Sequence, residues 1–200
     1  MLWGSPTTWF EIVAALLGIA MVVCNIRQIH WGWPLAIVSS AMYFWVFWRS
    51  GLYADASLQI FFIVVSVWGW VQWLHGKVDT AAAPVVQQLS TINAIKTVAA
   101  CAVFWLLIGG FLIQFTDTTV PWWDGFVTSV SLVATVLLGR KYISNWTLWV
   151  IVNVVSIGLF VYKGLYVTAL LYAVFGAMAV AGWLAWRRVL LHTPPTPVNA

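Results

Sequence analysis

Three side chains at helical spacing are the clearest candidates for a binding site: Trp146, Trp149 and Asn153. Steps of three and four residues place them on one face of a helix, and Ser156 continues that face. Two indoles beside an amide suit a flat ring with a polar substituent, because indoles stack on a ring while an amide hydrogen-bonds its edge. For a cationic ring, cation–π attraction would add about 2 kcal/mol.

Several of these polar and aromatic residues can be explained either by a structural role or by a role in the site. The chain has 16 tryptophans, and Trp146 suits an interfacial belt as well as a site. Trp149 and Asn153 lie deeper in the same segment, where a belt explains them less well. Gln59 must face protein or a cavity, because an unpaired amide in lipid costs several kcal/mol. Gln59 and Tyr172 therefore serve either as contacts between helices or as site residues.

The titratable residues do not assemble a catalytic centre. His30, His75 and His192 fall in predicted connections or in the tail, so they form no shuttle or metal triad. Glu11 and Asp124 each open a predicted helix, where a carboxylate is favourable near the positive helix end. With no acid deep in a span, the sequence predicts neither an enzyme nor ion coupling, and no cofactor or metal.

The elements that hold these residues are membrane helices. Of 200 residues, 63% are hydrophobic and 7% are charged, whereas a soluble domain has about 25% charged residues. The apolar stretches approach the length of about 20 residues that spans a bilayer. The nine Lys and Arg are scattered, so the net charge of +4 does not indicate nucleic acid. Cys24 and Cys101 lie in apolar runs and predict neither a disulfide nor a zinc site.

The chain therefore predicts an all-α membrane protein with seven transmembrane helices. The predicted spans are 9–26, 33–48, 56–74, 96–114, 123–139, 146–162 and 167–186. A surface loop with Lys77, Asp79 and Pro84 connects the third and fourth spans. The first run contains Glu11 and lacks a basic flank, so we expect it to stay as a span.

An internal repeat relates the two ends of the chain. The segment that begins at Gly51 resembles the segment that begins at Gly164, an offset of 164 − 51 = 113 residues. At the same offset Trp33 aligns with Trp146. One extra span lies between the copies, so the repeats share an orientation in a 3+1+3 parallel arrangement. The predicted units are a first repeat at 1–74, a loop and linker helix at 75–121, a second repeat at 122–188 and a disordered cytoplasmic tail at 189–200.

Parallel repeats in transporters bind their solutes near the bilayer midplane, between the copies. Polar positions that differ between the two copies are where the protein could recognise an asymmetric solute. The pairs are Ser40 with Asn153, Ala36 with Trp149, and Gln59 with Tyr172.

Lys and Arg predict the orientation, because they accumulate on the cytoplasmic side. Arg49 and Lys163 follow the second and sixth spans. The other seven cations follow the odd-numbered spans and are Arg27, Lys77, Lys96, Arg140, Lys141, Arg187 and Arg188. We therefore expect a periplasmic N-terminus and a cytoplasmic C-terminus.

Four motifs resemble those of a known family. They are Trp122-Trp123-Asp124, the run from Arg140-Lys141-Tyr142 through Asn145-Trp146-Thr147-Leu148-Trp149 to Asn153, Gly164-Leu165-Tyr166, and Leu58-Gln59-Ile60-Phe61-Phe62 with Gly69-Trp70. The chain resembles, over nearly its whole length, the PnuC-type vitamin transporters, typified by nicotinamide riboside uptake proteins of bacteria.

The resemblance implies seven spans as 3+1+3, similar to a full-length counterpart of the SWEET sugar transporters. It implies facilitated diffusion of nicotinamide riboside across the bacterial inner membrane, with a cytoplasmic kinase that traps the product for pyridine nucleotide biosynthesis. It also implies a homotrimer. The site residues that it implies are Trp146, Trp149, Asn153 and Gln59, followed by Tyr142, Asn145 and Tyr172.

Other solutes remain as alternatives. Relatives with this architecture take thiamine or riboflavin, each of which is also a flat ring with a polar appendage. A SWEET-like sugar uniporter is a more distant alternative, because a sugar requires a cavity rich in Asn, Gln and Asp rather than in aromatic residues.

Overall fold

The fold, seen in a computed structural model, is built from α-helices. The structure describes residues 9–49, 53–75 and 86–192, and seven helices lie within these ranges. They are α1 (Trp9–Ile26), α2 (Gly32–Arg49), α3 (Tyr53–His75), α4 (Thr91–Phe115), α5 (Pro121–Gly139), α6 (Ser144–Tyr162) and α7 (Tyr166–His192). Lys77, Asp79, Pro84 and the residues 193–200 of the predicted tail lie outside the described residues, as do the side chains of Glu11 and Asp55.

Two predicted boundaries differ most from the structure. Helix α4 begins at Thr91 rather than Lys96, because the Ser90 hydroxyl accepts a hydrogen bond from the Asn93 backbone N–H and caps the helix. Helix α7 runs past Trp186 to His192, into the segment 189–200 that was predicted to be a disordered tail. No glycine or proline interrupts the chain between Trp186 and His192, so nothing in the backbone stops the helix there.

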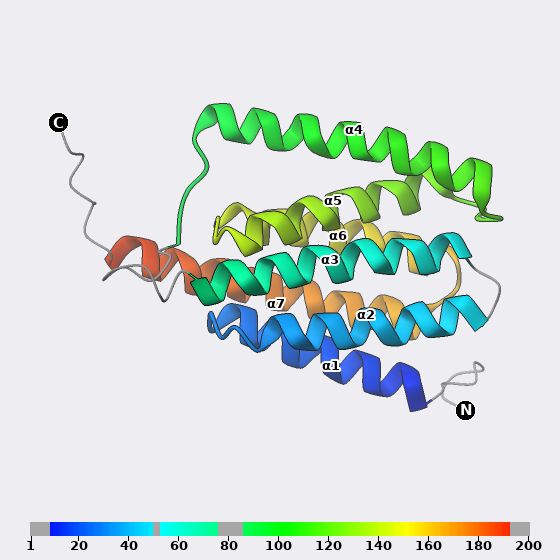
Figure 1. Cartoon of the computed structure of the whole chain (residues 1–200), viewed down its shortest axis with the longest axis horizontal. Coiled ribbons are helices and arrows are strands. Elements are labelled where there is room, and N and C mark those ends of the chain that lie inside the picture. The colour runs from blue at the N-terminus through cyan, green and yellow to red at the C-terminus, as the bar shows by residue number, and fades with distance from the viewer. Residues whose placement is uncertain (1–8, 50–52, 76–85, 193–200) are drawn as a thin grey trace.

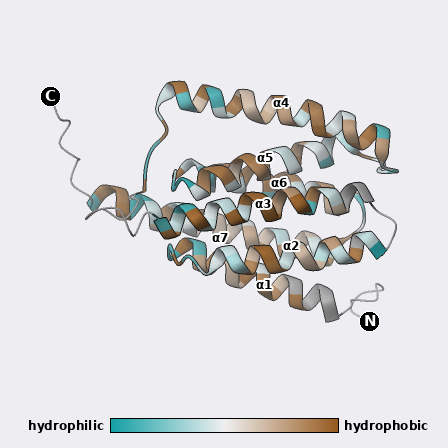
Figure 2. Cartoon of the chain, in the orientation of Figure 1, coloured by the Kyte–Doolittle hydropathy of each residue, from teal (hydrophilic) through white to brown (hydrophobic). Residues whose placement is uncertain are grey.

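Within the residues that the structure describes, five helices are long and apolar enough to cross a membrane, namely those from α3 to α7. In α1 and α2 the described apolar stretches are shorter, Ala15–Ile26 and Gly32–Val46. Hydrophobic residues run along the lengths of α3 and α4 (Figure 2). Many of them face outward, and Val98, Leu106 and Leu107 on α4 are each more than half exposed. Such a surface suits lipid, where exposed apolar side chains carry no cost.

Six of the helices form a closed ring. Around it, α1 packs on α2, α2 on α3, α3 on α5, α5 on α6, α6 on α7, and α7 on α1. Helix α4 packs against α5 and lies at the edge of the bundle (Figure 1). We call α1–α3 and α5–α7 the two halves of the ring, and they meet at two seams, α3 with α5 and α7 with α1.

The same aromatic packing occurs twice, 113 residues apart. Trp33 meets Trp73 edge to face, with ring centroids 5.6 Å apart, and Trp146 meets Trp186 in the same way at 5.6 Å. Each pair rests on a glycine, since a Cβ at Gly69 would collide with the Trp33 indole and one at Gly182 would lie 2.6 Å from Cε3 of Trp146. Close packing of large rings therefore requires glycine at these positions of α3 and α7.

Gly182→Ala and Gly158→Ala should change stability in opposite directions. At Gly182 the new methyl group forces the Trp146 indole aside, so we expect the free energy of unfolding to fall by about 1–3 kcal/mol. At Gly158 a Cβ meets nothing within 4 Å. Alanine should therefore stabilise α6 there by up to about 1 kcal/mol through its higher helix propensity. Thermal unfolding in detergent micelles measures both changes, and an equal Tm for the two variants would contradict this account.

Candidate solute-binding cavity

The ring surrounds a partly open cavity of about 330 Å³. Each of the six ring helices contributes to its lining, whereas α4 does not. Its walls combine aromatic rings, amides and hydroxyls, a composition typical of small-molecule sites.

The cavity draws matching positions from the two halves of the ring. Trp33 and Trp146, at an offset of 113, both line it, as do Phe62 and Phe175. The three pairs with different chemistry also line it in full: Ala36 with Trp149, Ser40 with Asn153, and Gln59 with Tyr172. Equivalent positions therefore place different groups around one space.

Five of the seven predicted site residues come together in this lining, and helix α6 supplies three of them. Trp146, Trp149 and Asn153 share one face of α6, as their spacing predicts. Asn153 is 4% exposed, and its Nδ2 donates to the Trp149 carbonyl at 2.7 Å, which holds the amide beside the indole. Gln59 on α3 and Tyr172 on α7 complete the five.

Tyr142 and Asn145 lie outside the cavity lining. Tyr142 lies four residues before Trp146, which is helical spacing, but α6 begins only at Ser144, so Tyr142 is in the turn that precedes the helix. There it pairs with Gln87 in an isolated β-bridge. Asn145 is fully buried, and its Nδ2 donates to the Tyr142 carbonyl at 2.6 Å. The two residues thus shape the start of α6.

Several lining residues were absent from the predicted site. Trp33, Asn25 and Tyr43 come from α1 and α2, and Phe62 and Phe175 from α3 and α7. The repeat carried a signal for some of them, since Trp33 is the equivalent of the predicted Trp146. The repeat also offered a signal for Asn25, because its equivalent at the same offset is the apolar Leu138 and the two positions therefore differ.

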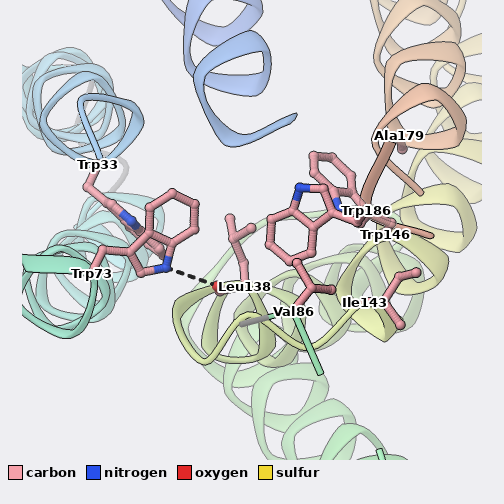
Figure 3. Close-up of a cluster of buried hydrophobic side chains, with 8 residues drawn as sticks. All are labelled: Trp33, Trp73, Val86, Leu138, Ile143, Trp146, Ala179 and Trp186. Carbon is pink, nitrogen blue, oxygen red and sulfur yellow. Dashed lines mark hydrogen bonds between the residues drawn. The ribbon is translucent and has the colours of Figure 1, made fainter. Parts of the chain in front are cut away.

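Four tryptophans, Trp33, Trp73, Trp146 and Trp186, belong to one buried cluster, and two of them, Trp33 and Trp146, also line the cavity. We call it the tryptophan plug. Nε1 of Trp73 donates to the Leu138 carbonyl at 3.2 Å, across the seam from α3 to α5 (Figure 3). Nε1 of Trp186 donates to the carbonyls of Asn25 and Ile26 at 3.3 and 3.2 Å, across the seam from α7 to α1. The plug therefore joins the halves at both seams.

A polar contact lies beside the plug. Nζ of Lys141 donates to Oε1 of Gln28 at 3.1 Å, and it lies 4.8 Å from the Trp73 ring centroid. The two residues are 113 apart and both have φ of 56°, so the turns after α1 and α5 share one backbone conformation and meet each other. The halves thus touch at equivalent points.

The described lining contains no Asp, Glu, Lys, Arg or His. Asp124, at the start of α5, instead pairs with Lys163 at 3.5 Å and accepts a hydrogen bond from the Thr118 hydroxyl. Within the described residues no group of three metal-ligating side chains comes together. The polar chemistry offered to a solute is therefore that of amides, hydroxyls and indole N–H groups.

Helices of membrane-spanning length around a central polar and aromatic cavity define a membrane transporter. The chain belongs to the family described as Nicotinamide mononucleotide transporter, whose profile matches residues 8–188. The family resemblance predicted from the sequence is thereby confirmed.

Individual relatives of the chain are described as nicotinamide riboside transporters. The chain is 26% identical to the nicotinamide riboside transporter PnuC of Escherichia coli, over 92% of this chain and 87% of that protein. It is 23% identical to the nicotinamide riboside transporter PnuC of Neisseria mucosa, over 93% of this chain and 74% of that protein. The crystal structure of the vitamin B3 transporter PnuC matches with a TM-score of 0.75 and 25% identity, covering 94% of this chain and 85% of that chain.

Proposed function

We propose that this protein carries nicotinamide riboside across the bacterial inner membrane. The observation that carries the proposal is a central cavity lined by indoles and amides without a charged side chain. A pyridinium ring is flat and cationic, so stacking and cation–π attraction to indoles suit it. The names of the relatives agree with this solute.

The charge of the lining favours the riboside over the mononucleotide. A phosphate group brings negative charge that has to be met by Arg, Lys or helix N-termini when it leaves water. The described lining offers no cationic side chain, so a buried phosphate would go uncompensated. The same argument supports trapping, because a cytoplasmic kinase would convert the solute into a form that the cavity disfavours. Facilitated diffusion with this trapping then needs no coupling ion.

We propose distinct roles for the site residues. Trp146 and Trp149 stack on the ring, and the amides of Asn153 and Gln59 bind its polar groups together with the hydroxyl of Tyr172. Tyr142 and Asn145 act indirectly, because they position the first turn of α6 and with it both indoles.

We propose seven spans in a 3+1+3 parallel arrangement, with the N-terminus periplasmic and the C-terminus cytoplasmic. The recurrence of the Trp–Trp–Gly packing at an offset of 113 and the position of α4 outside the ring support this arrangement. The excess of Lys and Arg after the odd-numbered helices supports the orientation. The tryptophan plug then closes the cytoplasmic end of the cavity. A homotrimer is a further part of the proposal.

Purified protein in proteoliposomes should take up radiolabelled nicotinamide riboside. We expect excess unlabelled nicotinamide riboside to block this uptake, and nicotinamide mononucleotide, riboflavin and glucose to leave it unchanged. Thiamine has a cationic ring and is the informative competitor. Labelled thiamine that enters while labelled nicotinamide riboside does not would overturn the proposed solute.

Trp149→Ala should weaken solute affinity by about 1–3 kcal/mol, the range for the loss of one aromatic stacking partner. The matched control is Trp123→Ala, since Trp123 is 58% exposed and lies outside the cavity lining. Isothermal titration with nicotinamide riboside measures both affinities. Equal affinity in the Trp149 variant and in the unmodified protein would remove Trp149 from the site.

Trp73→Phe combined with Trp186→Phe should open the plug end. Each change keeps a ring but removes an indole N–H that crosses a seam, and two lost hydrogen bonds cost about 2 kcal/mol, roughly a 30-fold change in the closed population. With Cys24 and Cys101 replaced by Ser, a reporter cysteine introduced by Ala36→Cys lines the cavity. We expect a membrane-impermeant maleimide to label it faster from the cytoplasmic side.

The control for this experiment is Trp70→Phe. Nε1 of Trp70 donates to Nδ1 of His30 at 3.4 Å, and both residues belong to the same half of the ring. Labelling that rises equally in the control and in the double variant would show that the cross-seam bonds do not hold the plug closed.

A further inference from the structure

Three hydroxyl side chains line the cavity at the seam where α3 meets α5. They are Ser66 on α3 and Ser131 and Thr135 on α5, and they are 3, 7 and 8% exposed. We call these three residues the hydroxyl wall. Ser131 and Thr135 are four residues apart, so they lie one above the other on the face of α5 that meets the cavity.

The hydroxyl wall keeps hydrogen-bonding capacity for a solute. Oγ1 of Thr135 donates its proton to the Ser131 carbonyl at 2.8 Å, which leaves the Thr135 oxygen as an acceptor. The hydroxyls of Ser66 and Ser131 have no hydrogen-bond partner among the described residues. Unlike the hydroxyl of Ser156, however, neither is closed off from the open space of the cavity. They can therefore both donate to and accept from a solute.

The equivalent positions at the other seam are apolar. At an offset of 113 they are Ala179 on α7 and Gly18 and Val22 on α1, and all three also line the cavity. A Cβ at Gly18 would lie 3.0 Å from Cζ of Phe175, so an aromatic ring packs where Ser131 places a hydroxyl in the other half. The packing of the ring therefore does not require hydroxyls at these positions, and their presence at one seam makes the cavity asymmetric.

The hydroxyl wall lies at the same depth as the proposed stacking residue. Thr135 and Ser131 lie four and eight residues before Gly139 at the end of α5, about 6 and 12 Å at 1.5 Å per residue. Helix α6 runs back along α5 from the following turn, and Trp149 lies five residues after its start at Ser144, about 8 Å. A ring that stacks on Trp149 therefore has the hydroxyl wall of the neighbouring helix at its own level.

We propose that the hydroxyl wall is the subsite for the ribose of the solute. This assignment rests on the proposed function. The Thr135 oxygen accepts a hydrogen bond from one ribose hydroxyl, and the hydroxyls of Ser66 and Ser131 pair with the other sugar oxygens. Because the equivalent positions at the α7–α1 seam offer no hydrogen bond, the sugar is directed to the α3–α5 seam and the solute binds in one orientation.

The test compares nicotinamide riboside with its 2′,3′-dideoxy analogue, which keeps the ring, the carboxamide and the glycosidic bond. By isothermal titration in detergent, the unmodified protein should bind the riboside at least about tenfold more tightly than the analogue. Thr135→Val copies Val22, and Ser66→Ala copies Ala179. Each should weaken riboside binding by about two- to tenfold, the value of one hydrogen bond, and leave the affinity for the analogue unchanged. In the double variant the preference for the riboside should fall further.

The matched control is Thr97→Val on α4, outside the ring. The Thr97 hydroxyl donates to the Asn93 carbonyl at 2.8 Å, so this change removes the same kind of bond that Thr135→Val removes, away from the cavity. Both affinities should be those of the unmodified protein.

Melting temperature and size-exclusion profile establish that each variant is folded. The two single changes lie on different helices, so either variant that folds decides the matter. Unmodified protein that binds neither compound would overturn the proposed function. Unmodified protein that binds the riboside and the analogue equally, or folded variants that keep the full preference for the riboside, would overturn the ribose subsite alone.

Discussion

The structure depends on the hydrogen bonds that indole N–H groups make across the two seams of the ring. Trp73 and Trp186 donate to carbonyls in the last turns of α5 and α1. The carbonyls of Leu138 and Asn25 also accept the backbone N–H groups of Lys141 and Gln28, so each indole adds a further hydrogen bond to a helix end. In a bilayer, burial of apolar surface does not hold helices together, so close packing and such bonds have to do so. These contacts lie at the same end of the ring, so they join the two halves there.

The two halves divide their residues between scaffold and site. Positions with the same residue in both halves, such as Trp33 with Trp146, pack against glycines and build the plug. These two tryptophans also line the cavity. Positions that differ, such as Ser40 with Asn153, supply the amides and aromatic rings of the cavity. An arrangement of this kind lets a nearly symmetrical ring hold an asymmetrical solute.

The uncharged lining links the proposed solute to the proposed direction of transport. A delocalised cation can be stabilised by indole faces, whereas a phosphate has no such partner in this cavity. Phosphorylation in the cytoplasm would then prevent the return of the solute without an ion gradient. The charged pair Asp124 and Lys163 lies at the other end of α5 from the plug, away from the cavity.

The sequence by itself determined the helices, their order and the family, because apolar length and charge spacing dictate spans in a bilayer, and α1 has the predicted bounds. It also determined the face of α6 that carries Trp149 and Asn153, since helical spacing is local. Only the tertiary structure decided that Tyr142 falls outside the lining and that Asn25 enters it. Those outcomes depend on where a helix begins or ends and on what packs against it. Spacing along the chain does not encode such contacts between distant segments.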